Sequence, residues 1–411
     1  MRVPIDSLED TRERVTRLEL RHKAVFGSRP DRGYFAVAVP LRICPLGAHS
    51  DHQGGTVTGV TIDRSITLLG RVRDDSSVRV YSENFDEERH FDLSDIPPKV
   101  NGDWANYARG VASAIREEHP FTRRGFDAVV HGSMPVGGLS SSAAVTIAYA
   151  RALEHANAIS HSALETILLV RATENGYLGL HNGILDQSVI VSSKKNHLTT
   201  IQCLSHSIET VAPAEAHQPY EILIVYSGLS RQLTATPFNQ RVAECKEAAK
   251  LLFEFSGRSA GESPILAAAG TEAFQEYGDR LPEALCRRAR HFFTEADRVK
   301  QGIAAWKRGR MDEFGALVTA SGESSIVNYE SGSPALISLY EILAGISGVY
   351  GTRFCGGGFQ GCCLALIDPS KREAITGALH EGYTKKHPEL ADLYSLHICH
   401  SSDSVSLEVF S

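Results

Sequence analysis

Apolar residues recur every three or four positions in several parts of the chain, which is the spacing of one face of an α-helix. The first such stretch covers residues 7–26, where Ser7 and Asp10 form the pattern of a capping box. The same periodicity predicts helices at residues 104–117, 141–157, 162–178, 240–255 and 282–308. Helices are therefore expected in both halves of the chain.

Short stretches rich in β-branched residues lie between turn-forming residues and predict strands. They fall at residues 34–41, 66–72, 77–82, 126–131, 198–203 and 221–226. The chain becomes polar and irregular beyond His181, and a glycine-rich segment at 351–361 lies between apolar runs. This mixture predicts an α+β fold. The change of pattern near residue 205 predicts two domains, 1–205 and 206–411, with a ligand site at their interface.

The composition of the 411-residue chain excludes several classes of protein. Hydrophobic residues make up 42% and charged residues 22%, as in a folded globular protein. The net charge is −7 and no dense Lys/Arg run occurs, so neither a nucleic acid nor an anionic membrane is expected as a partner. No apolar run typical of a signal peptide or a membrane span is found, which predicts a cytoplasmic protein. The eight cysteines form no CxxC pair and are expected to be reduced.

The segment after the strand at 126–131 has the chemistry of an anion-binding loop. Gly137 and Gly138 allow close approach of a ligand, and the hydroxyls of residues 140–142 open the predicted helix. The first amides of a helix are unpaired and carry partial positive charge, so they attract phosphate. The loop is neither a Walker loop nor GxGxxG. A serine-capped helix after a glycine turn is the alternative interpretation.

Three further polar clusters could carry chemistry. Residues 42–55 gather hydrogen-bonding side chains after a strand, although a surface loop would also explain them. Glu174 lies late in a predicted helix, and Asp186 lies among apolar residues, where a carboxylate can be a desolvated base, a cap or a core ion pair. The consecutive glycines at 356–358 indicate a close approach of backbone, and a tight hairpin is the alternative.

In their order and spacing the four segments resemble the GHMP kinases, and within them the galactokinase-like sugar-1-kinases. The first reads R-I-C-P-L-G-A-H-S-D-H-Q-G-G from Arg42, the second P-V-G-G-L-S-S-S-A-A from Pro135, and the last C-G-G-G-F-Q-G from Cys355. The resemblance covers nearly the whole chain. It implies a two-domain fold, with an N-terminal ribosomal-protein-S5-like domain, a C-terminal ferredoxin-like domain and the active site between them.

The resemblance also implies roles for individual residues. The phosphates of ATP would be bound by Gly137, Gly138, Leu139, Ser140, Ser141 and Ser142. Ser142 and Glu174 would hold Mg²⁺, and Trp104 would lie near the adenine. Asp186 would be the base at the anomeric hydroxyl and Arg42 would stabilise the developing charge. Sugar hydroxyls would be bound by His49, Asp51 and the amide of Gly183.

Departures from the galactokinase pattern indicate the substrate. Ala48 stands where galactokinases have a glutamate that binds the sugar's sixth-carbon hydroxyl, and this change resembles the galacturonokinases. A glutamate there would repel a uronate, so alanine favours galacturonate over galactose. Phe238 replaces a tyrosine at the sugar and Gln360 interrupts the glycine loop. Arg231, His52 and backbone amides are candidates to bind the uronate.

The leading hypothesis is therefore an ATP- and Mg²⁺-dependent kinase that makes α-D-galacturonic acid 1-phosphate for nucleotide-sugar salvage. A galactokinase that tolerates Ala48 is the first alternative, and a non-catalytic sugar sensor is the second. The oligomeric state is left open.

Overall fold

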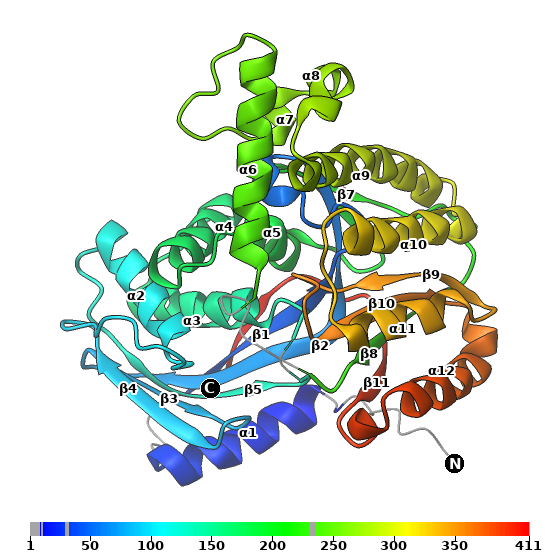
Figure 1. Ribbon diagram of the computed structural model, residues 1–411. Coiled ribbons are helices and arrows are strands. Elements are labelled where there is room, and N and C mark those ends of the chain that lie inside the picture. The colour runs from blue at the N-terminus through cyan, green and yellow to red at the C-terminus, as the bar shows by residue number, and fades with distance from the viewer. Residues whose placement is uncertain (1–8, 10, 29–32, 136, 230–235, 411) are drawn as a thin grey trace.

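The structure is a computed structural model that describes residues 9, 11–28, 33–135, 137–229 and 236–410 (Figure 1). Its α-helices are α1 Thr11–Phe26, α2 Asn106–Glu118, α3 Ser141–Asn157, α4 Ala163–Ala172, α5 Leu185–Ser192, α6 Phe238–Phe255, α7 Leu266–Ala269, α8 Thr271–Tyr277, α9 Glu283–Lys307, α10 Met311–Val327, α11 Pro334–Ala344 and α12 Arg372–Lys386. Its strands are β1 Tyr34–Ile43, β2 Thr56–Val72, β3 Ser77–Ser82, β4 Glu87–Asp92, β5 Phe126–Gly132, β6 Leu198–Gln202, β7 Ser207–Val211, β8 Glu221–Tyr226, β9 Val349–Phe354, β10 Cys362–Ile367, β11 Ser395–Cys399 and β12 Ser406–Phe410.

The first sheet has the strand order β12-β1-β2-β5-β3-β4, and the β6–β7 hairpin pairs with the start of β2. Alternate residues of β1 point to opposite faces, as the two-residue period of a strand requires. Phe35 and Val37 pack into the main core with α2 and α3, whereas Tyr34 and Ala36 pack with Leu18 of α1. Helices therefore cover the sheet on both faces, with α1 below it and α2 and α3 above it in Figure 1.

The second sheet is antiparallel, with the strand order β11-β8-β10-β9. One face packs on α11 and α12 through Leu223, Val225 and their neighbours. The opposite face, which includes Ile222 and Ile224, joins the same core as the first sheet. The two sheets thus share one continuous core.

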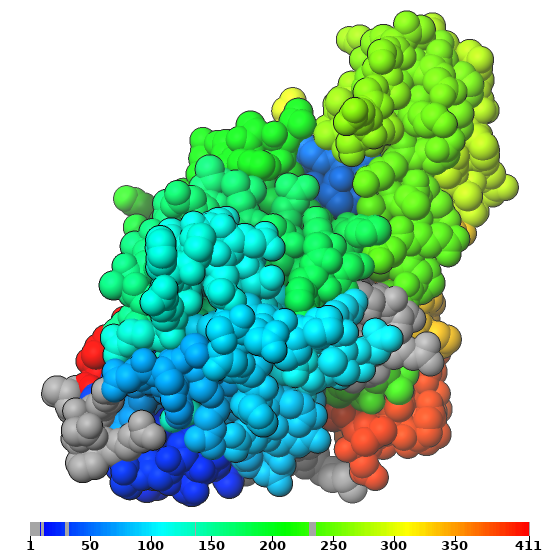
Figure 2. Space-filling view, turned by 90° about the vertical axis from the view of Figure 1, so that its left-hand side faces the viewer, coloured from blue at the N-terminus to red at the C-terminus, as the bar shows by residue number. Residues whose placement is uncertain are grey.

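A lobe of helices α6, α7 and α8 stands out from the two sheets (Figures 1 and 2). Its core consists of apolar side chains from these helices and from α9, including Leu252, Phe253 and Phe292. The other end of α6 reaches the candidate site, because Phe238 packs against Leu180 there. This long helix therefore connects the lobe to the site.

Most predicted elements are confirmed, but three features differ. The helix predicted at 162–178 ends at Ala172 and continues as the π-helical turn η2, Thr173–Tyr177. The segment after His181, predicted to be irregular, contains helix α5. Strands β4, β7 and β12 and helices α10, α11 and α12 were not predicted. The capping box of Ser7 and Asp10 lies outside the described residues.

The division at residue 205 falls in the turn between β6 and β7, and β12 returns from the end of the chain to pair with β1. The segment 206–411 therefore contributes β7 and β12 to the first sheet. The boundary between the proposed domains 1–205 and 206–411 stays a prediction. All eight cysteines are buried and none forms a disulfide. Among the described residues, no helix combines the length and the apolar character that a membrane crossing requires.

Candidate active site

Two of the sequence motifs meet in an ion pair between Arg42 and Asp186. Arg42 lies near the end of β1 and is 2% exposed, while Asp186 lies in the first turn of α5. The Nε and Nη2 atoms of Arg42 donate to Oδ1 of Asp186 at 2.9 and 2.6 Å, and Nη1 donates to the carbonyl of Gly138 at 3.0 Å. Burial lowers the pKa of Arg42, but the charge of Asp186 outweighs it and the pKa is raised. Arg42 therefore stays cationic and leaves Oδ2 of Asp186 unused.

The loop before α3 presents uncapped helix amides. Ser140 has a left-handed backbone, with φ 60°, and its side chain does not cap the helix. Its hydroxyl is buried without a hydrogen-bond partner among the described residues. The alternative of a serine-capped helix is therefore wrong. The amides of the first turn, which starts at Ser141, remain available to an anion such as phosphate.

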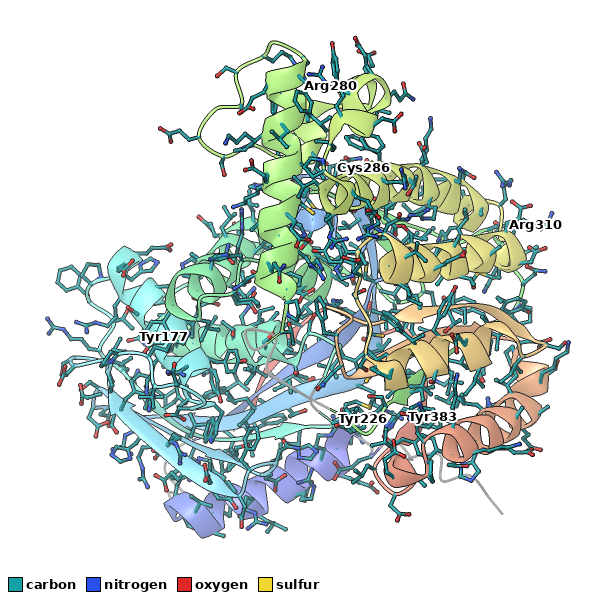
Figure 3. The ribbon with its side chains drawn as sticks, in the orientation of Figure 1. Tyr177, Tyr226, Arg280, Cys286, Arg310 and Tyr383 are labelled. Carbon is teal, nitrogen blue, oxygen red and sulfur yellow. The ribbon has the colours of Figure 1, made fainter. Side chains whose placement is uncertain are left out.

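The glycine-rich segment near the C-terminus packs directly on this loop. A Cβ atom added to Gly137 would lie 2.9 Å from the Cα atom of Gly361, and one added to Gly356 would lie 2.7 Å from the carbonyl oxygen of Gly138. Side chains do not fit at such distances. The same added atom at Gly137 would lie 3.8 Å from the ring of Tyr226, which ends β8. Tyr383 of α12, labelled in Figure 3, donates its hydroxyl to the carbonyl of Ser227, the residue after Tyr226, at 2.6 Å.

Glu174 is a fully buried carboxylate on η2 beside this loop. Asn182 donates to its Oε2 atom at 2.8 Å, and Oε1 has no hydrogen-bond partner among the described residues. Burial, and then the charge of Asp186, raise the pKa of Glu174 to about 8, although Asn182 and Ser142 oppose the rise. A carboxylate with a free oxygen next to a serine hydroxyl is an oxygen donor set that suits Mg²⁺. The two residues expected to hold the metal therefore lie together.

Asp51 and Gly183 are also brought together next to Asp186. The Oδ2 atom of Asp51 accepts from the amide of Leu185 at 3.4 Å. A Cβ atom added to Gly183 would lie 2.5 Å from that same oxygen, so no larger residue fits there without displacement. Burial, and then the charge of Asp186, raise the pKa of Asp51 to about 6. These contacts place two predicted sugar-binding residues on the same side as the candidate base.

Ala48 and His49 belong to the 42–55 segment and lie in apolar and aromatic surroundings. Ala48 is 4% exposed and packs with Cys44 and Ile184. The ring of His49 stacks on Tyr329 with a centroid distance of 4.0 Å, and its Nε2 atom has no hydrogen-bond partner among the described residues. Burial lowers the pKa of His49 well below its ordinary value, so this ring is neutral.

Both halves of the chain match the GHMP kinase family. The profile of the GHMP kinases N terminal domain matches residues 106–194, and that of the GHMP kinases C terminal matches residues 303–385. A galacturonokinase from Arabidopsis thaliana is 44% identical over 383 residues, which cover 88% of this chain and 90% of that protein. The chain belongs to the GHMP kinases. It is an ATP-dependent sugar kinase of the galactokinase type, as its matches to galactokinases also indicate.

Two of these galactokinases illustrate the likeness along the whole chain. A galactokinase from Enterococcus faecalis is 32% identical over 91% of this GHMP kinase and 95% of that protein. The crystal structure of Lactococcus lactis galactokinase complexed with galactose superposes with a TM-score of 0.86 at 30% identity, covering 94% of this chain and 98% of the other. The two-domain GHMP kinase fold is therefore confirmed, and with it the expected α+β class.

Two further predicted site residues are aromatic, and of these Phe238 lies beside the site, its ring centroid 6.1 Å from that of His52. Trp104 precedes α2 in this kinase and stacks on Phe85, with a centroid distance of 6.1 Å, while its Nε1 atom donates to Glu87 at 3.3 Å. Phe238 is buried against Leu180 and Phe359 and offers no polar atom. The roles of Trp104 at adenine and of Phe238 at the sugar stay predictions. Arg231 lies outside the described residues.

Sequence reasoning missed two buried side chains of α9 that fix the Gly47–Ala48 backbone in this kinase. Oε1 of Glu295 accepts from the amide of Gly47 at 2.7 Å, and the Nε2 atom of His291 donates to the carbonyl of Ala48 at 3.0 Å. Glu295 is itself held by Arg298 at 2.6 Å and lies 3.6 Å from Nη1 of the fully buried Arg353. A glutamate on the apolar face of a long helix was the available signal.

Replacing Glu295 by glutamine should lower the free energy of unfolding by about 3 kcal/mol, because it leaves the buried Arg353 without a negative charge. Urea denaturation measures this loss. The control is Glu283→Gln on the same helix, whose side chain is 86% exposed and whose replacement should cost less than about 0.5 kcal/mol. Equal stability of the two variants would mean that the buried charge of Glu295 does not hold the loop.

Proposed function

We propose that this kinase transfers the γ-phosphoryl group of ATP to the anomeric hydroxyl of D-galacturonic acid, giving α-D-galacturonic acid 1-phosphate. The observation that carries the choice of substrate is Ala48. It occupies the position where galactokinases are expected to have a glutamate, and it lies between a neutral His49 and apolar neighbours. Position 48 itself therefore presents no negative side chain to a carboxylate on the sixth carbon of the sugar. The 44% identity to a galacturonokinase supports the same substrate.

The geometry supports a direct transfer in which the protein mainly positions the reactants. Oδ2 of Asp186, the oxygen that Arg42 does not engage, accepts the proton of the anomeric hydroxyl. Arg42 lies between this carboxylate and the carbonyl of Gly138, where its charge stabilises the developing negative charge. The amides of the loop before α3 bind the phosphates, with Trp104 near the adenine.

The sugar is held on the side of Asp186 opposite to the phosphate-binding loop. Asp51, His49 and the amide of Gly183 bind its hydroxyl groups, and Phe238 contributes an apolar wall. Because the amide of Gly47 and the carbonyl of Ala48 are both fixed by α9, the loop is preorganised for this task. The sugar 1-phosphate that forms would then be used for nucleotide-sugar salvage.

A galactokinase is the second candidate, favoured by the likeness to the galactose complex of the Lactococcus lactis enzyme. The test is an ADP-release assay with Mg·ATP and a panel of galacturonate, glucuronate, galactose, glucose and arabinose. We expect galacturonate to be turned over with the highest kcat/KM. A preference for galactose would support the second candidate. If no sugar causes ADP release, a non-catalytic sensor would be supported. The ion pair of Arg42 and Asp186 argues against a sensor.

Mg²⁺ would bind at Ser142 and Glu174 and would neutralise charge on the transferring phosphates. The raised pKa of Glu174, about 8, makes a prediction about this metal. Below pH 8 the carboxyl is mostly protonated, so metal binding must release its proton. At pH 7 we expect release of about 0.9 proton per Mg·nucleotide bound, and an apparent affinity that falls about tenfold for each pH unit below 8. Calorimetry in buffers of different ionisation enthalpy measures the released proton.

The matched control is Glu174→Gln, which has nearly the same shape and no proton to release. This variant should bind Mg·nucleotide more weakly and with no proton release between pH 6 and 8. Equal proton release from both proteins would show that another group titrates, and Glu174 would then not be the metal ligand.

A further inference from the structure

A second group of polar side chains lies where α2 ends, away from the active site. Glu118 is the last residue of α2, His119 follows it, and His161 lies in the connection between α3 and α4. One ligand atom of each residue lies within 4.8 Å of the other two. The Nε2 atoms of His119 and His161 are 3.2 Å apart, and Oε2 of Glu118 is 3.3 Å from Nε2 of His161.

The orientation of His161 is fixed by a second layer of contacts. Its Nδ1 atom donates to Oε1 of Glu154 at 2.9 Å, and Arg151 donates to the other oxygen of Glu154 at 2.6 Å. Because Nδ1 carries the proton, the Nε2 atom of a neutral His161 presents its lone pair toward His119 and Glu118. A carboxylate that orients a histidine in this way is the usual arrangement behind a metal-bound imidazole.

The spacing fits a tetrahedral ion. Zinc binds histidine nitrogen at about 2.0–2.1 Å, so two ligands of a tetrahedral zinc lie about 3.3 Å apart. The two observed separations match this value. His161 is 8% exposed, whereas the side chain of Glu118 is 55% exposed, so water can complete the coordination from the outer side. The nitrogen-rich donor set suits zinc better than Mg²⁺, which prefers oxygen ligands.

We propose that Glu118, His119 and His161 bind one Zn²⁺ ion, with Glu154 as the residue that orients His161. The ion would join the end of α2 to the start of α4. These two helices contact each other, and α4 continues into η2, which carries Glu174. The site would thus stabilise the part of the fold that carries Glu174, without taking part in the reaction.

The test uses the full-length protein, freed of metal by dialysis against a chelator and then titrated with Zn²⁺ against a chromophoric competitor. We expect one equivalent to bind, and we expect His119→Ala and His161→Ala to lose about 100-fold in affinity. Binding should raise the Tm of the unmodified protein by about 3 °C or more and leave the Tm of His119→Ala unchanged. His90→Ala, which removes an exposed histidine from β4, is the control and should bind like the unmodified protein.

His161 is buried, so its variant could fail to fold for other reasons. A second measurement avoids this difficulty, because Co²⁺ added to the unmodified protein should give the visible absorption of a tetrahedral ion, which Zn²⁺ then abolishes. Equal Zn²⁺ affinity of the unmodified protein and His119→Ala would overturn the proposal. Absence of a Co²⁺ spectrum would also overturn it, and the three residues would then be a hydrogen-bonded chain only.

Discussion

Asp186→Asn should lower kcat about 10³-fold while the affinity for ATP changes less than about threefold. An asparagine side chain keeps the size of the aspartate and an oxygen to accept from Arg42, but it cannot take up the proton of the anomeric hydroxyl. Loss of a general base typically reduces turnover by about 10²–10⁴-fold. Steady-state ADP release measures kcat, and calorimetry with a non-hydrolysable ATP analogue measures nucleotide binding.

Asp63→Asn is the matched control for this prediction. The side chain of Asp63 is 22% exposed, close to the 21% of Asp186, and it lies on β2 beside Arg64 and His400 rather than in the site. Its replacement should leave kcat unchanged within about twofold. If Asp186→Asn also retains full turnover, Asp186 is not the base and Arg42 is paired with it for structural reasons only.

Ala48→Glu should lower kcat/KM for galacturonate about 100-fold or more and affect galactose far less. Two carboxylates about 4 Å apart repel by about 4 kcal/mol at the effective dielectric constant of a partly desolvated site. A repulsion of half that size already lowers kcat/KM for galacturonate more than tenfold. Galactose carries no charge, so the new glutamate can only hydrogen-bond to it or crowd it. Parallel kinetics with the two sugars measure the change in preference.

Crowding has to be separated from charge, because Ala48 is buried and its carbonyl accepts from His291. Ala48→Gln provides this separation, since glutamine has nearly the volume of glutamate without its charge. The ratio of the two variants with galacturonate then reports the repulsion alone. If Gln and Glu reduce galacturonate turnover equally, Ala48 is a packing position and the choice of substrate depends on other residues.

The sequence could predict the local parts of the site because their signals are local. Glycines followed by serines at a helix start predicted the anion-binding loop, and α3 begins at Ser141 as expected. Helix α5 was missed although Leu185, Val189 and Ile190 have helical spacing, because His181 and Gly183 made the segment look irregular. The π-helical turn that carries Glu174 also left no signal in the periodicity.

Contacts between distant segments could not be predicted from spacing. Glu295 binds the amide of Gly47 from 248 positions away, and only the folded chain shows that pairing. The contact of Gly137 with Gly361 is similar, since each glycine segment has its own local explanation as a turn. Both segments contain glycine because their backbones approach each other so closely that no volume is left for side chains.

The pairing of β12 with β1 has a consequence for how the protein acquires its structure during synthesis. Tyr34 pairs with Phe410, so one edge of the first sheet cannot close until β12 has left the ribosome. Contacts between such distant residues form slowly, because a long loop must be closed before they contribute. Until then β1, the strand that carries Arg42, has an unpaired edge that another chain could occupy. Nascent chains of this kinase should therefore depend on chaperones until β12 has been synthesised.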